Sequence, residues 1–123
     1  MPSTEPRGPR QILRAARYSM QGLHAAWRHE ASFRLEAMLL IPLLPAAILL
    51  GRSAVERGLL VATVLLVPAM ELLNAGLEAI VDKTTPEQHV LAGRAKDMGS
   101  AAVFVCMCSA ALVWSLVALE RFL

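Results

Sequence analysis

Residues 98–119 read MGSAAVFVCMCSAALVWSLVAL, a run of 22 residues without a formally charged side chain. A helix of about 20 apolar residues is long enough to cross the hydrocarbon core of a bilayer. The chain has 123 residues, of which 56% are hydrophobic and 18% charged. A soluble domain this short could not bury so much apolar surface, because small domains have a large surface for their volume. The sequence therefore predicts an all-α integral membrane protein.

Two further spans are predicted upstream of this run, which gives three in all. They cover about residues 33–51, 58–81 and 98–120. Pro42 and Pro45 predict a kink or a local break in the first span, and Pro68 interrupts the hydrogen-bond ladder of the second. A polar turn at 51–57 and a short loop at 82–85 are predicted between them. Thr85, Pro86 and Gln88 are typical of a helix start, as N-cap, first residue and reciprocal cap partner.

The N-terminal part of the chain divides into two segments. Residues 1–9 are predicted to be disordered, and residues 10–123 to form a single membrane domain. Within 10–30, apolar side chains recur every three or four residues, and a second stripe beside them is mostly basic. This pattern predicts an amphipathic helix in the membrane interface. The alternative is a helix that packs on the chain's own bundle.

The basic residues are distributed unevenly along the chain. Nine of them precede the first predicted span, stand at its start or lie between the second and third spans: Arg7, Arg10, Arg14, Arg17, Arg28, Arg34, Lys83, Arg94 and Lys96. Three fall on the other side: Arg52, Arg57 and Arg121. The positive-inside rule therefore predicts a cytoplasmic N-terminus. A net charge of +2 is too small to indicate nucleic-acid binding. Cys106 and Cys108 point in opposite directions on a helix and are interpreted as small apolar residues.

Glu71, Asn74 and Glu78 form a polar face on the second predicted span, because spacings of three and four residues place them on one side of a helix. Ionisable groups at membrane depth are costly and usually functional. A rise of 1.5 Å per residue from Gly58 puts Glu71 roughly 20 Å and Glu78 roughly 30 Å into the membrane, towards the cytoplasmic side. A polar seam that only joins helices is the alternative, but two glutamates need a cation between them.

Other polar residues are predicted at the same level. Glu30 ends the amphipathic helix, and carboxylates with an amide suit Mg²⁺, although Glu30 could simply pair with Arg34. On the third span's helix Lys96 could bind a phosphate, with Gly93 permitting close approach. Taken alone, each of these residues is better interpreted as a solvated residue next to the membrane. Together they supply the groups that phosphoryl transfer needs, in a chain without a Gly-rich phosphate loop.

Several motifs resemble those of the small prokaryotic diacylglycerol kinases. They are ELLNAGLEAIVD at 71–82, GRAKDMGSAA at 93–102, ARYS at 16–19 and GLHAAWRHEASFR at 22–34. The resemblance implies a homotrimer of three-span subunits in the bacterial inner membrane, with active sites shared between neighbours. It also implies an enzyme that phosphorylates diacylglycerol to phosphatidic acid with Mg·ATP. The chain departs from the family pattern at Gln11, Met20 and Pro68.

The same resemblance assigns roles to individual residues. Glu71 would be the general base, Glu30 and Glu78 would hold Mg²⁺, Asn74 would support their geometry, and Lys96 would contact the phosphates. The remaining residues implied are Tyr18, Glu87, Gln88, His89 and Asp97 around the nucleotide, and Glu36 and Ser100 on the lipid side.

The polar face supports association independently of the resemblance. Three helices cannot enclose a face that bears Glu71 and Glu78, and small residues at 75–76 and 109–111 allow helices to approach closely. Three alternatives to a diacylglycerol kinase stay open. The spans do not distinguish diacylglycerol from undecaprenol as the lipid substrate. A proton-coupled transporter would more naturally carry its carboxylate at mid-membrane, and a passive assembly subunit leaves the acidic face unexplained.

Overall fold

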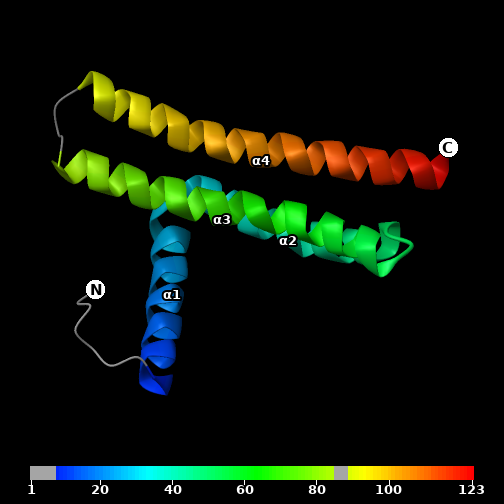
Figure 1. Ribbon diagram of the computed structural model, residues 1–123, viewed down its shortest axis with the longest axis horizontal. Helices are drawn as coiled ribbons and strands as arrows, with labels where there is room; N and C mark the ends of the chain where they lie inside the picture. The colour runs from blue at the N-terminus through cyan, green and yellow to red at the C-terminus, as the bar shows by residue number, and fades with distance from the viewer. Residues whose placement is uncertain (1–7, 85–88) are drawn as a thin grey trace.

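The computed structural model describes residues 8–84 and 89–123, and every regular element in these ranges is an α-helix. The helices are α1 (Pro9–His29), α2 (Ala31–Leu50), α3 (Ala54–Thr84) and α4 (Val90–Phe122). The last three are long and apolar enough to cross a membrane. They run alongside one another, whereas α1 projects away from them (Figure 1). The predicted all-α fold, with three spans and one N-terminal helix, is confirmed.

Helix α1 ends where the chain turns sharply into α2. Pro9 stands in its first turn, where its fixed φ suits a helix start. Glu30 has extended backbone angles (φ −117°, ψ 105°) and separates the two helices. The Arg34 guanidinium donates to the carbonyl oxygens of Trp27 and Arg28, at 2.8 and 3.1 Å. Arg34 therefore caps α1 instead of forming the ion pair with Glu30 that the sequence left open.

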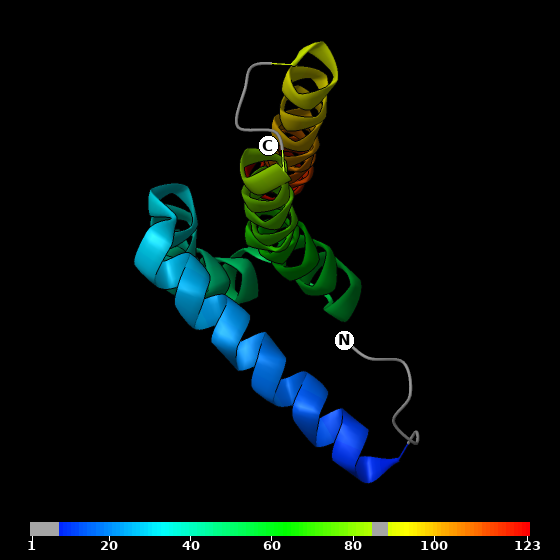
Figure 2. The same cartoon turned by 90° about the vertical axis from the view of Figure 1, so that its left-hand side faces the viewer.

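The apolar stripe of α1 is exposed along most of its length. Leu13 is 71% and Met20 65% exposed, and α1 leaves the bundle as a separate arm (Figure 2). Packing on the chain's own bundle is limited to the end of the helix, where Ala26 is buried. An exposed apolar stripe beside basic residues is suited to a membrane interface, which supports the interfacial interpretation.

Each of the three long helices begins before its predicted span, and α3 and α4 also end after theirs. Helix α2 continues through Pro42 and Pro45 without the break that was one of the two expectations. Helix α3 begins at Ala54, where the Ser53 hydroxyl accepts a hydrogen bond from the Glu56 amide, and it continues to Thr84. Residues 82–84, predicted as loop, therefore belong to α3.

The predicted start of the last helix falls partly outside the described residues. Thr85, Pro86 and Gln88 lie outside them, as do residues 1–7 of the predicted disordered N-terminus. In the described part, His89 is the N-cap of α4, because its imidazole accepts from the Leu91 amide at 3.1 Å. A helix of 33 residues spans about 50 Å, which is more than the hydrocarbon core requires.

Helix α3 is the central element of the bundle and packs against both α4 and α2. The buried hydrophobic side chains among the described residues are few: Ala26, Phe33, Ala47, Leu60, Val64, Val67, Val103 and Val117. Leu60 is fully buried, and its carbonyl accepts a hydrogen bond from Trp114 Nε1 at 3.2 Å. Most of the remaining apolar surface faces outward, as expected where lipid or another subunit covers it.

At the distal end of the bundle, defined by Leu50, Gly51, Arg57 and Arg121, arginines join the three long helices. Arg57 Nε donates to the carbonyl of Ile48, and Arg121 Nη1 donates to that of Leu50. These contacts satisfy carbonyls that the end of α2 leaves without intrahelical partners. Gly51 is buried against Arg57, so the turn has no room for a side chain.

Gly51→Ala should therefore destabilise the protein. A Cβ at Gly51 would lie 2.6 Å from Arg57 Cγ and 2.9 Å from the Arg57 amide nitrogen, and relief of such overpacking costs about 1–3 kcal/mol. Gly58→Ala is the matched control, since a Cβ there meets nothing within 4 Å and alanine favours a helix. Thermal unfolding in detergent measures both. A Gly51→Ala midpoint at or above that of the wild type would contradict this account of the turn.

Candidate active site

The polar face of α3 lies where the other helices approach it. Glu71, Asn74 and Glu78 are half-buried, on successive turns of one helix, as their spacing predicted. Each of them faces a different neighbouring group.

On the first of these turns, Glu71 meets Glu36 of α2. The two carboxyl groups are close enough to interact across the α2–α3 interface. Glu36 Oε1 is buried and has no hydrogen-bond partner among the described residues. Beyond Glu36 lies an apolar cavity of about 210 Å³ that Pro68 also lines. Glu36, predicted on the lipid side, and Glu71, the predicted base, are thus brought together across the α2–α3 interface.

One turn further on, Asn74 packs against the backbone of α4. Its Oδ1 is buried and has no hydrogen-bond partner among the described residues. A Cβ added at Gly99 would overlap this oxygen, so only glycine leaves room for the Asn74 amide. The close approach of α3 and α4 occurs at Gly99, whereas a Cβ at Gly93 would meet nothing within 4 Å.

At the end of α3, a cation reaches across from α4. Lys96 Nζ forms an ion pair with Asp82 Oδ1 at 2.9 Å. The Glu78 carboxylate, one turn before Asp82, is also within electrostatic range of this ammonium group. Lys96 was predicted at the level of Glu78, and the helix pair places it there.

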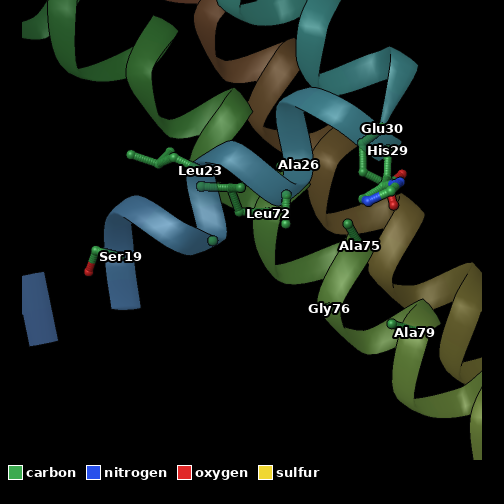
Figure 3. Close-up of a pocket in the computed structure, with 11 residues that line it drawn as sticks. Ser19, Leu23, Ala26, His29, Glu30, Leu72, Ala75, Gly76 and Ala79 are labelled. Carbon is green, nitrogen blue, oxygen red and sulfur yellow. The ribbon is translucent and has the colours of Figure 1, made fainter. Parts of the chain in front are cut away.

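A cleft of about 740 Å³ separates α1 from α3. Figure 3 shows Glu30 and His29 at one end of it, Ser19 towards the other, and the small side chains of Ala75 and Ala79 opposite. The cleft is wide because α3 presents alanine and glycine to α1 along this stretch. Glu30 therefore faces the helix that carries Glu78, from the other side of an open space.

The other predicted site residues are either exposed or not described by the structure. Tyr18, His89, Asp97 and Ser100 are exposed in the isolated subunit, and Glu87 and Gln88 lie outside the described residues. Exposure leaves these side chains available to a ligand or to a neighbouring subunit. Their roles remain predictions.

The carboxylates suit a metal that is bound together with nucleotide. Among the described residues, no three His, Cys, Asp or Glu side chains are close enough to hold a metal ion. Mg²⁺ commonly takes one or two protein carboxylates and completes its shell with phosphates and water. Glu30 and Glu78 supply such oxygen ligands, and they fit this mode of binding better than a site built from protein alone.

Comparisons with known proteins identify the family of this chain. A family model described as "Prokaryotic diacylglycerol kinase" matches residues 17–118. The chain belongs to the prokaryotic diacylglycerol kinase family. It is 43% identical to a diacylglycerol kinase of Escherichia coli strain K12 over 112 residues, which cover 91% of this chain and 92% of that protein. It is 45% identical to one of Pseudomonas aeruginosa, with 91% of each chain covered, and 43% identical to one of Haemophilus influenzae.

Two residues of this family member were missed by sequence reasoning. Asp82 was assigned to a loop, although it lies four residues after Glu78 and therefore on the same face of α3. Gly99 was passed over in favour of Gly93. The available signal was its place in the run 99–102, where small residues allow another helix to approach.

Gly99→Ala should impair catalysis in this kinase family member more than it impairs folding. The new Cβ would displace the Asn74 amide, and a displacement of about 1 Å near a reacting centre can reduce turnover roughly 100-fold. Phosphate transfer to lipid and the thermal midpoint are measured on the same preparations, with Gly58→Ala as the control. Turnover equal to that of Gly58→Ala would show that the Asn74–Gly99 contact has no role in positioning.

Proposed function

We propose that this protein is a lipid kinase that transfers the γ-phosphate of Mg·ATP to diacylglycerol and releases phosphatidic acid and ADP. The observation that carries the proposal is the order of groups along α3. A pair of carboxyl groups, Glu36 and Glu71, lies nearest the middle of the spanning helices, and the Lys96 cation lies at the end of the same face. A lipid hydroxyl arrives from the membrane and ATP from water, so this order matches the two substrates. Membership of the kinase family supports it.

Glu71 is the proposed general base. It takes the proton of the lipid hydroxyl as the oxygen forms a bond to the γ-phosphorus, while the bond from that phosphorus to the bridging oxygen breaks and ADP leaves. Glu36 contacts Glu71 directly and would orient its carboxylate. Asn74, held against Gly99, would fix the turn of α3 between the base and Glu78.

The nucleotide would bind at the ends of α3 and α4. Lys96 supplies a positive charge for the phosphates, and the surrounding residues are proposed from the family motifs: Tyr18, Glu87, Gln88, His89 and Asp97. Glu30 and Glu78 would hold Mg²⁺ with the phosphates. When bound, the metal neutralises charge on the transferring group. Ser100 would contact the lipid.

A homotrimer in the bacterial inner membrane, with the N-terminus in the cytoplasm, completes the proposal. The isolated subunit leaves the cleft between α1 and α3 open and several predicted site residues exposed. A neighbouring copy could cover both, which favours active sites shared between subunits. The excess of basic residues before the first span supports the orientation.

A two-lipid assay tests the substrate. Purified protein in mixed micelles receives Mg·ATP with either diacylglycerol or undecaprenol, and labelled phosphate in the lipid fraction is measured. We expect transfer to diacylglycerol to exceed transfer to the polyprenol at least tenfold in kcat/KM, a difference of about 1.4 kcal/mol in transition-state binding. The reverse preference would assign the polyprenol as substrate. Transfer to neither lipid would overturn the kinase proposal.

The metal requirement gives a second test. Because the described carboxylates do not form a complete metal site, Mn²⁺ used as a spectroscopic substitute should bind measurably only when ATP is present. Glu30→Gln and Glu78→Gln should each raise the metal concentration needed for half-maximal binding by roughly 10–100-fold. Glu120→Gln, at the exposed end of α4, is the control for the change in net charge. Tight metal binding without nucleotide would contradict the shared site.

A further inference from the structure

The ion pair between Lys96 and Asp82 affects the proposed nucleotide site. Lys96 is the cation expected to contact the phosphates, yet its ammonium group is already bound to Asp82 at 2.9 Å. The pair joins the end of α3 to the first turns of α4, on either side of residues 85–88. A phosphate that binds Lys96 must therefore share the cation with Asp82 or displace it.

The pair is accessible enough to exchange partners. The side chains of Lys96 and Asp82 are 40% and 64% exposed. Exposed ion pairs are weak because water solvates both charges, whereas a polyphosphate offers several anionic oxygens at once. Lysine is a flexible point charge and can move between two anions without a fixed geometry.

The charge of Asp82 acts against nucleotide binding in two ways. Asp82 occupies the cation, and its carboxylate repels the phosphates of a nucleotide placed near Lys96. Glu78, also within range of Lys96, differs because bound metal would offset its charge. Among the described residues, Lys96 is the one cation that forms an ion pair with Asp82, so the charge of Asp82 is not offset in this way once Lys96 turns to phosphate.

We propose that Asp82 is a positioning residue that competes with nucleotide phosphates for Lys96 and thereby weakens the binding of ADP. This inference rests on the proposed kinase function and assigns a role to a residue outside the predicted site. Asp82 keeps Lys96 at the nucleotide end of α3 before binding and takes it back as ADP leaves. The result is a site that binds ATP reversibly and does not retain product.

The test is the dissociation constant for ADP, measured by calorimetry with Mg²⁺ on the full-length protein in detergent. Asp82→Asn should bind ADP roughly three- to tenfold more tightly than the wild type. Asp82→Glu restores the charge and should return the constant towards the wild-type value. Asp82→Ser removes the charge with a smaller side chain and gives a second measurement if the asparagine variant misfolds.

Two controls separate competition from a general charge effect. Glu120→Gln makes the same change in net charge at the distal end of α4 and should leave the constant unchanged. In a Lys96→Met background, Asp82→Asn should not increase the affinity for ADP. Unchanged or weaker ADP binding in Asp82→Asn would overturn the inference. An equal gain in ADP affinity from Asp82→Asn in the Lys96→Met background would also overturn it. A wild-type protein that binds no nucleotide would overturn the kinase proposal together with this inference.

Discussion

The structure depends on how the polar face of α3 is kept from lipid. Carboxylates and amides in a spanning helix are costly in hydrocarbon, so each must meet another group. Glu71 meets the carboxyl group of Glu36, Asn74 meets the backbone of α4 at Gly99, and Glu78 lies within range of Lys96. This explains the central position of α3, because α2 and α4 must both pack against it to cover one face.

The two ends of the bundle differ in construction. At the distal end, Arg57 and Arg121 bind the last carbonyls of α2, and Gly51 leaves the turn no free space. At the other end, the cleft beside α1 is open and the Lys96–Asp82 pair is exposed. One end holds the helices in register. The other leaves side chains free to exchange partners, as binding and release of a substrate require.

The sequence was sufficient to predict what depends on local pattern. Apolar runs identified the spans, and the spacing of Glu71, Asn74 and Glu78 identified their shared face. The features that the sequence could not predict depend on the register between helices. Gly93 and Gly99 are equally small, and only the packing of α4 on α3 places Gly99 against Asn74. Asp82 is a charged residue at the end of an apolar stretch, which is typical of a loop. In the structure it belongs to α3, because α4 packs alongside α3 up to this point.

Of the kink and the local break that Pro42 and Pro45 predicted, the break does not occur. Each proline removes one backbone N–H, and a break is expected when water must satisfy the freed carbonyl. Inside a packed membrane bundle the helix can continue through the proline, as α2 does at Pro42 and Pro45. The family motifs supplied residue roles that neither helical period nor packing assigns.

The central claim is that the polar face of α3 performs phosphoryl transfer with Glu71 as base. The most direct measurement is the turnover number of Glu71→Gln for phosphate transfer to diacylglycerol, with Mg·ATP binding measured on the same sample. The account predicts that turnover falls by roughly 10²–10⁴-fold while nucleotide affinity is retained. Turnover within a few-fold of the wild type would contradict it, because a glutamine cannot take the proton of the lipid hydroxyl.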